Sequence, residues 1–213
     1  MAEYHKIHTC FKRDMEGTKK ILLGEWTNPA FRYLQDDQWF WSEKVDGTNI
    51  RVYWDGIGAI FGGRTDNAQI PSGIINRLNQ LFLTIGQKEK LREKFPEGGV
   101  CFYGEGYGAG VQKAGINYNA KDKDFVLFDI MINGLYLERD NVEDIAISLG
   151  LDVVPIMDMG TLNEAIESAR KGFISTWGNF LAEGYVLRPL TELNDRRGNR
   201  IITKIKHVDF LGL

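Results

Sequence analysis

Two apolar segments separated by a short polar loop constrain the fold of this chain more than any other feature. Residues 39–41 (WFW) and 50–54 (IRVYW) are rich in the aromatic and β-branched side chains that strands favour. In the second segment Ile50, Val52 and Trp54 alternate with Arg51 and Tyr53, as expected of a half-buried strand. The pattern predicts that the loop is carried by a sheet.

The loop itself, residues 43–49, reads EKVDGTN and contains one lysine, Lys44. A lysine in such a loop becomes a nucleophile where packed walls, neighbouring cations or a metal ion favour its neutral amine. Asp46 and Gly47 allow the backbone to turn sharply beside a ligand. An ordinary surface lysine on a hairpin loop has the same local pattern, so the rest of the chain must decide between the two interpretations.

Composition limits the classes of protein that fit. A chain of 213 residues can bury a sizeable core, and this length predicts one large domain or one domain with a small appendage. The formal net charge of -3 gives no global signature of nucleic-acid binding, so such a partner would need a local basic surface. Cys10 and Cys101 form no Cys-x-x-Cys pair, which predicts reduced thiols in a cytoplasmic protein. Without a signal peptide or a long apolar run, no membrane partner is expected.

The N-terminal segment contains His5, His8 and Cys10, three residue types that can ligate zinc. A fourth ligand and a second ligand pair are missing, so an edge strand or a packed N-terminal arm is the favoured interpretation.

A hairpin and a glycine-rich segment follow the lysine loop. Asp55-Gly56 predicts a turn into a second strand at residues 60–61, which ends at Gly62-Gly63-Arg64. Arg64 could bind a phosphate or a ribose near the lysine loop, or could be a solvated strand-end arginine.

The glycine-rich segment begins after a predicted strand at residues 100–104. Its glycine spacing does not match the dinucleotide-binding fingerprint, and the chain has no Walker-type loop. Glu105, at the strand end, is a candidate for binding a ribose hydroxyl or a metal-bound water.

Two later strands carry further polar candidates. The nearly apolar run at 124–132 places Phe128 and Asp129 on opposite faces of a buried strand, where the carboxylate needs a partner and Phe128 could simply pack in the core. Glu183-Gly184 precedes a strand at 185–188. In the strand at 201–206, Lys204 and Lys206 share one face, about 7 Å apart. They would repel unless an anion such as a polyphosphate lies near them, or they could be solvated residues of an edge strand.

The remaining elements are predicted to be scaffold. Helical periodicity predicts an amphipathic helix at 73–85, interrupted at Gly86, and an exposed helix at 88–95. Asn141 is expected to cap a helix that ends at Gly150, and Thr161 with Glu164 forms a capping box for a helix that ends at Gly172. A strand is predicted at 153–156.

The order of these features resembles the motifs of the covalent nucleotidyltransferases, the superfamily of polynucleotide ligases and messenger-RNA capping enzymes. The motifs that carry this resemblance are Lys44-x-Asp46-Gly47, Arg64, Glu105, Phe128-Asp129, Glu183-Gly184 and Lys204-x-Lys206. The chain is most similar to the bacteriophage RNA ligase 2-like family, on EKVDGTN at 43–49 and on YGEGYG at 103–108 with VQK at 111–113. The resemblance covers nearly the whole chain. It implies an α+β nucleotidyltransferase (adenylation) domain of antiparallel sheets flanked by helices, an ATP-grasp-like ligase core.

The resemblance also implies a role for each motif residue. Lys44 would attack the α-phosphate of ATP, release pyrophosphate and carry AMP as a lysyl-AMP. Glu43 would contact the adenine amine, Phe128 would stack on the base, and Asn49 and Arg64 would orient ribose and phosphate. Asp46, Glu105 and Glu183 would hold the water shell of a Mg²⁺ (or Mn²⁺) ion. Lys204 and Lys206 would bind the α-phosphate. AMP would pass to a 5′-phosphate end, which a 3′-hydroxyl then joins.

Two departures from the family pattern bear on the substrate. RNA ligase 2-like enzymes often have histidine at the position of Asp46, and aspartate is commoner in DNA ligases and capping enzymes. The chain also ends seven residues after Lys206, so we expect a single adenylyltransferase domain over residues 1–213 with no C-terminal OB-fold, which argues against capping. The grip on a duplex would come from an accessory protein or from the basic cluster of Arg188, Arg196, Arg197, Arg200, Lys204 and Lys206.

The sequence therefore favours an ATP-dependent RNA ligase that seals 3′-hydroxyl and 5′-phosphate ends or nicks, with nucleic acid as its partner. A stand-alone DNA nick ligase is the nearest alternative, and a non-catalytic module that binds nucleotide or RNA ends is the alternative from another class. The resemblance suggests a phage-encoded protein of RNA repair in the host cytoplasm. The sequence predicts no oligomeric state.

Overall fold

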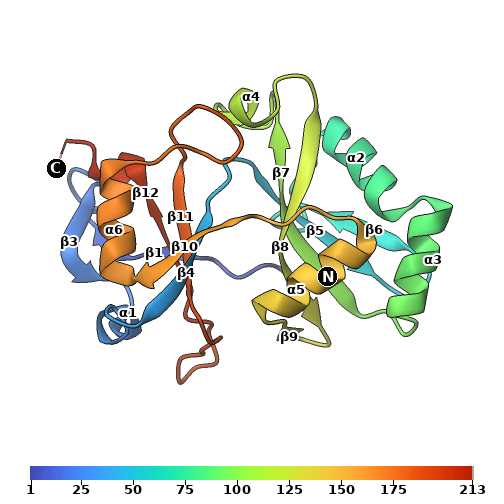
Figure 1. Cartoon of the computed structure of the whole chain (residues 1–213), viewed down its shortest axis with the longest axis horizontal. Helices are drawn as coiled ribbons and strands as arrows, with labels where there is room; N and C mark the ends of the chain where they lie inside the picture. Colours follow the sequence, from blue (N-terminus) through green and yellow to red (C-terminus); the bar gives the residue numbers. More distant parts are fainter. Residues whose placement is uncertain (213) are drawn as a thin grey trace. The chain divides into compact units, whose positions relative to one another are not determined.

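The fold is described from a computed structural model, in which residues 1–212 are placed (Figure 1). Contacts between residues divide the chain into two units: unit 1 comprises Met1–His5 and Asp46–Val154, and unit 2 comprises Lys6–Val45 and Pro155–Leu213. Both contain largely antiparallel sheets with helices beside them, so the predicted α+β class is confirmed.

Unit 1 is built on a five-stranded antiparallel sheet in the order β6-β5-β7-β8-β9. Its strands are β5 (Thr48–Trp54), β6 (Ala59–Gly62), β7 (Val100–Gly108), β8 (Lys123–Ile132) and β9 (Leu135–Tyr136). The predicted turn between β5 and β6 is confirmed, because the Asp55 carboxylate accepts hydrogen bonds from the backbone amides of Ile57 and Gly58. Strand β7 runs four residues beyond the predicted end at 104, through the glycine-rich segment.

Four helices belong to unit 1: α2 (Ser72–Phe82), α3 (Ile85–Lys94), α4 (Gly115–Tyr118) and α5 (Arg139–Leu149). The amphipathic pattern of α2 buries Ile74, Leu78 and Phe82 in a core shared with the sheet. The break that we expected at Gly86 lies at residues 83–84 instead, because the Thr84 hydroxyl caps α3.

The prediction that Asn141 caps helix α5 is wrong by three residues. Glu138 is the N-cap and the helix begins at Arg139. The buried Arg139 stabilises this additional first turn, since its guanidinium donates to Glu143 one turn later and to the carbonyl of Val154. The end of α5 at Gly150, in the left-handed conformation, is as predicted.

Unit 2 contains a second five-stranded sheet, in the order β1-β12-β11-β4-β10. Its strands are β1 (His8–Thr9), β4 (Gln38–Glu43), β10 (Ile156–Thr161), β11 (Gly184–Pro189) and β12 (Thr203–Lys206). All its pairs are antiparallel except β1 with β12. Strands β2 (Phe11–Arg13) and β3 (Ile21–Trp26) form a separate two-stranded sheet. The predicted strand at 153–156 is wrong, since β10 begins at Ile156 and Val153 forms only a single bridge with Leu127 of unit 1.

Helix α6 (Leu162–Lys171) lies beside this sheet in Figure 1, and α1 (Pro29–Tyr33) and the 3-10 helix η1 (His207–Phe210) complete unit 2. The predicted capping box of α6 is present, with both hydrogen bonds between Thr161 and Glu164. Its apolar face packs with Trp39, Trp41 and Leu187 of the sheet in one core. Among residues 1–212 no helix is both long and apolar enough to cross a bilayer.

Candidate active site

The register of three neighbouring strands brings the lysine loop next to the tail motifs of unit 2. Glu43, the last residue of β4, pairs with Tyr185 of β11, and the amide of Lys44 donates to the carbonyl of Gly184 (2.9 Å). Gly184 in turn pairs with Lys206 of β12. Positions 44, 184 and 206 therefore lie side by side across three strands, although the first is separated from the others by more than a hundred residues of sequence.

The carboxylate of Glu183 is bound by two of the predicted site lysines. Lys44 Nζ donates to Glu183 Oε2 at 2.6 Å, and Lys206 Nζ lies 2.5 Å from Glu183 Oε1. All three side chains are partly buried, with exposed fractions of 19% for Lys44, 13% for Glu183 and 31% for Lys206. One negative charge thus stands between two positive ones, and this cluster keeps a net positive charge suited to a phosphate.

Gly184 allows this close packing of strands. Its φ of +152° lies outside the region that most side chains adopt, and a Cβ here would be 2.0 Å from the carbonyl oxygen of Ile205. The backbone of Glu183 is fixed on the same strand pair, because its carbonyl accepts from the amide of His207 (2.9 Å).

The expected arrangement of the last strand is confirmed. Lys204 and Lys206 are partly exposed, whereas Thr203 and Ile205, which alternate with them, are buried. The anion nearest Lys206 is the carboxylate of Glu183.

Glu43 is almost completely buried in unit 2, with 1% of its surface exposed. Its Oε2 accepts hydrogen bonds from the backbone amide (2.9 Å) and the hydroxyl (3.0 Å) of Thr176. Sequence reasoning missed Thr176, which lies 133 positions away in a segment without a recognisable motif.

In unit 1, the start of β5 brings Asp46, Gly47 and Asn49 beside the glycine-rich strand β7. Asn49 pairs with Glu105, and a Cβ on Gly47 would be 2.8 Å from Glu105 Cγ, so only glycine allows this approach. The amide of Asp46 donates to the Tyr118 hydroxyl (3.3 Å). Asn49 Oδ1 is buried and has no hydrogen-bond partner within residues 1–212.

Arg64 is exposed and follows the end of β6, near the start of β5, as predicted for a strand-end arginine. Sequence reasoning missed the fully buried Arg51, which holds the segment carrying Arg64. Its guanidinium donates to the carbonyl of Gly63 (2.7 Å) and to Asp66 (2.8 Å). An arginine in an otherwise apolar strand was the available signal.

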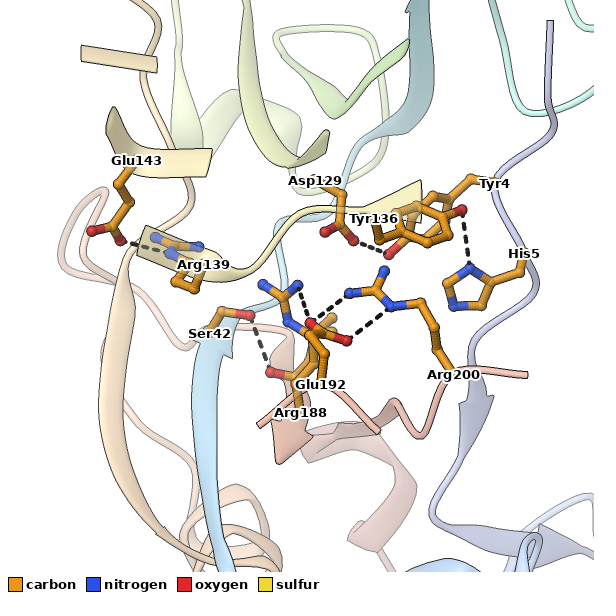
Figure 2. A network of polar contacts seen from close by, with 11 residues as sticks. Tyr4, His5, Ser42, Asp129, Tyr136, Arg139, Glu143, Arg188, Glu192 and Arg200 are labelled. Atoms are coloured by element: carbon orange, nitrogen blue, oxygen red, sulfur yellow. Dashed lines mark hydrogen bonds and ion pairs between the residues drawn. The ribbon is translucent and has the colours of Figure 1, made fainter. Parts of the chain in front are cut away.

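Phe128 is partly exposed and contacts the ring of Tyr4 edge-on, with centroids 5.0 Å apart, so the alternative of plain core packing is wrong. Asp129, the next residue of the strand, is buried and has the partner that its burial requires. It accepts a hydrogen bond from the Tyr4 hydroxyl at 2.5 Å (Figure 2).

The carboxylates offer oxygen ligands but no ready metal cage. In residues 1–212, no group of three or more His, Cys, Asp or Glu side chains could hold a metal ion by itself. The Cys10 thiol is buried, and burial raises its pKa to about 12. Mg²⁺ commonly keeps several waters and binds through one or two carboxylates together with substrate phosphates. Asp46 and Glu105 in unit 1 offer carboxylate oxygens of that kind.

The basic cluster predicted to grip nucleic acid divides into two parts. Arg188 and Arg200 are nearly buried and share the carboxylate of Glu192, with N–O distances of 3.2 and 2.7 Å (Figure 2). They are therefore not available for phosphate contacts, and the prediction is wrong for these two. Arg196 and Arg197 are exposed.

Comparison with known proteins places this geometry in a family. The family model described as RNA ligase matches residues 37–206, whereas comparison with curated proteins gives no match. Among solved structures, the Naegleria gruberi RNA ligase with PPi is similar, with a TM-score of 0.66 and 20% identity over 98% of this chain and 63% of that chain. A point mutant of that ligase with ATP and Mn has a TM-score of 0.66 and 18% identity, over 97% of this chain and 62% of that one.

The chain thus spans less than two thirds of the length of these ligase structures. At this level of identity, the structural likeness concerns the fold. The family match, in contrast, is a match of sequence that includes the lysine loop and the last predicted motif, Lys204-x-Lys206. It extends over most of the chain, from the start of β4 to the end of β12. The chain therefore belongs to the RNA ligase family.

Proposed function

We propose that the protein is an ATP-dependent polynucleotide ligase that acts on RNA ends or nicks through a lysyl-AMP intermediate. The observation that carries the proposal is the contact of Lys44 and Lys206 with the single carboxylate of Glu183. Lys44 loses a proton and its amine attacks the α-phosphorus of ATP. The new N–P bond replaces the bond to the β-phosphate, and pyrophosphate leaves. Lys204 and Lys206 bind the α-phosphate and stabilise its developing charge.

The unit 1 residues contribute to nucleotide binding in this proposal. Asn49 and Arg64 orient ribose and phosphate, and Phe128 stacks on the base. The unpartnered Oδ1 of Asn49 and the partly exposed ring of Phe128 are consistent with these roles. Glu43 of unit 2 accepts a hydrogen bond from the adenine amine. We further propose that the two units act as one adenylyltransferase domain.

Asp46, Glu105 and Glu183 are the residues that would hold the water shell of a Mg²⁺ or Mn²⁺ ion. When bound, such an ion neutralises phosphate charge during the transfer. The similar Naegleria ligase was solved with ATP and Mn, which supports the same nucleotide and a divalent metal here.

RNA is the substrate that the family favours, and the second half-reaction follows from its ends. AMP is transferred to a 5′-phosphate, and a 3′-hydroxyl then attacks that phosphorus and displaces AMP to form the phosphodiester. We assign the activity to RNA repair in the cytoplasm of a phage host, with an accessory protein as the partner that aids duplex binding.

Intact-mass spectrometry of the purified protein tests the first step. After incubation with a divalent metal and ATP, we expect the mass to increase by one AMP, and pyrophosphate should remove it. Lys44→Ala should abolish the adduct, because it removes the nucleophile, whereas Lys94→Ala, an exposed lysine at the end of α3, should leave it intact.

Nicked RNA and nicked DNA duplexes then distinguish the substrates. If neither ATP nor GTP adds mass to the unaltered protein with any metal, the proposed ligase activity is refuted. Adduct formation on Lys44 followed by sealing of DNA alone would assign the protein to the DNA nick ligases.

A further inference from the structure

The carboxylate of Glu43 is satisfied on one side only. Both hydrogen bonds from Thr176 go to Oε2, at 2.9 Å from the amide and 3.0 Å from the hydroxyl. The second oxygen, Oε1, is buried and has no hydrogen-bond partner among the described residues. Glu43 also has no ion-pair partner within residues 1–212.

A carboxylate oxygen in this position needs a donor. Burying an acceptor without a hydrogen bond is unfavourable, and this is more so for an ionised group. Buried polar atoms in folded proteins nearly always have partners, and an exception points to a ligand or a water. Neither Thr176 nor any other described residue donates a hydrogen bond to Oε1, which leaves a ligand or a water as the donor.

The segment that carries Thr176 is fixed by its own hydrogen bonds. Ile174 and Leu181 form an antiparallel bridge, and the Ser175 amide donates to the carbonyl of Phe180 (2.9 Å). The Trp177 amide donates to the buried Ser175 hydroxyl (3.1 Å). This short hairpin, residues 174–181, is followed closely by Glu183. It holds Thr176 within hydrogen-bond distance of Glu43, the last residue of β4.

We propose that Thr176 is a positioning residue that makes the site selective for a 6-aminopurine nucleotide. Thr176 fixes the carboxylate of Glu43 so that Oε1 faces a ligand that donates an N–H. The 6-amino group of adenine is such a donor. Guanine presents a carbonyl oxygen at that position, and two acceptors would then face each other without a proton between them. The proposal rests on the proposed nucleotide-binding function and adds a residue that decides which base is accepted.

Equilibrium binding to the Lys44→Ala background tests Thr176 separately from covalent chemistry. ATP is compared with purine riboside triphosphate, which lacks the 6-amino group but is otherwise the same ligand. Thr176→Val removes the hydroxyl while keeping the size of the side chain. We expect it to weaken ATP binding about 10-fold, the effect of losing one hydrogen bond to a charged group. Purine riboside triphosphate should bind both forms with the same affinity, within about 2-fold.

Thr176→Ser provides the conservative rescue, since it keeps the hydroxyl, and it should bind ATP as the Thr176 protein does. Thr27→Val is the matched control in the same unit: it removes a hydroxyl that donates to the carbonyl of Thr9, away from Glu43, and should not change the ratio between the two ligands. The preference for ATP over GTP should fall in Thr176→Val alone.

Equal weakening of both ligands by Thr176→Val would mean that Thr176 only maintains the hairpin, and would overturn the proposal. Unchanged ATP binding would overturn it as well, as would equal affinity of the Thr176 protein for ATP and purine riboside triphosphate. If the expected binding pattern holds but the unaltered protein forms no lysyl adduct, the inference about the base stands and the proposed ligase activity fails.

Discussion

At the residue scale, Glu183 is the group on which the proposed chemistry of unit 2 depends. Its two oxygens hold Lys44 and Lys206, so it fixes both ammonium groups in the absence of a nucleotide. Once a phosphate and a metal ion arrive, the lysines can exchange the carboxylate for phosphate oxygens. The amine of Lys44 must leave this contact and lose a proton before it can attack.

Glu183→Gln should therefore impair adenylylation much more than folding. The amide retains the shape of the side chain but lacks the charge that balances two lysines and attracts a metal ion. We expect the rate of AMP transfer to Lys44 to fall by about 100-fold or more, the usual loss for a group that acts on charge in the transition state. The measurement is the time course of adduct formation by intact mass, with the urea midpoint as a check on folding.

Glu192→Gln is a suitable comparison, because Glu192 also lies between two cations but pairs with Arg188 and Arg200. It should lower stability and leave the intrinsic rate of transfer close to that of the unaltered protein. Equal rates for Glu183→Gln and the unaltered protein would contradict the role of Glu183.

The sequence predicts an individual contact only where both residues belong to a recognisable motif. Lys44, Glu183 and Lys206 were chosen from the sequence, and the structure brings them together. Thr176 and Tyr4 were not chosen, because each acts on a residue more than a hundred positions away and has no local pattern. Such partners are set by strand order and side-chain packing, which the sequence does not display.

At the scale of elements, the junction of β11 and β12 determines whether Glu183 and Lys206 meet. Gly184→Ala should disrupt it, since the added Cβ would lie 2.0 Å from the carbonyl oxygen of Ile205 at a φ of +152°. We expect the free energy of unfolding to fall by about 3 kcal/mol, from backbone strain and overpacking. Urea unfolding measures the change, and adenylylation should be lost with it.

Gly86→Ala is the control for this glycine substitution. It lies in helix α3 with open space where the Cβ would be, so it should raise stability by about 0.5–1 kcal/mol. A Gly184→Ala variant as stable as the unaltered protein would show that the strands can shift to make room.

The capping box of α6 gives a pH-dependent contribution. Hydrogen bonds from the Thr161 amide and hydroxyl hold the pKa of Glu164 below its ordinary value. The charged form is thus favoured in the folded state, so its contribution is present above the pKa of the unfolded chain and is lost as the pH falls through the folded value. Glu164→Gln should lower the urea midpoint at neutral pH, and the difference should shrink as the pH falls through the lowered folded-state pKa of Glu164.

Glu167→Gln on the same helix serves as the matched control, because Glu167 is exposed and lies 3.8 Å from Arg170 without a capping role. It should change the midpoint little at either pH. A difference between Glu164→Gln and the unaltered protein that persists in acid would contradict the assigned cause.

The sequence predicts turns and helix caps that are encoded within a few consecutive residues. It does not predict the bounds of strands that depend on packing against residues distant in sequence. The turn at Asp55 and the box at Thr161 are encoded within a few residues, and both are confirmed. Strand β7 continues through Gly106 because the side chains of Ile50 and Ile74 pack where a Cβ would be. Its glycines suggested a loop, and only the packing of the neighbours explains why they extend a strand.

At the scale of the whole molecule, a net charge of -3 means that the RNA substrate of the proposed ligase would have to be attracted by a local basic surface. Arg196 and Arg197 occupy an ordered turn, in which the Asp195 carboxylate accepts from the amides of Arg197 (2.8 Å) and Asn199 (2.9 Å). Their side chains are exposed, unlike the nearly buried guanidinium groups of Arg188 and Arg200.

The double variant Arg196→Ala/Arg197→Ala should weaken RNA binding and make it less sensitive to salt. Each lost phosphate contact should reduce the slope of log K against log salt by about 0.7–0.9. Transfer of AMP to Lys44 should continue, since it needs no RNA. Fluorescence anisotropy with a nicked RNA duplex measures both affinity and slope.

Arg92→Ala/Lys94→Ala, which removes two exposed cations from α3, is the matched control for charge and should change the slope less. Equal effects of the two double variants would show that overall charge, rather than the turn at 195–199, governs binding.

The order of strands in unit 2 also sets an order of events during protein synthesis. Strand β4 is made early, but its sheet partners β10 and β11 follow only after all the strands of unit 1 have been translated. The strands of unit 1, in contrast, pair mostly with neighbours in sequence and can form their sheet first. The contact of Lys44 with Glu183 closes a separation of 139 positions. During translation, Lys44, the proposed nucleophile, therefore leaves the ribosome long before Glu183, the carboxylate that binds it, has been synthesised.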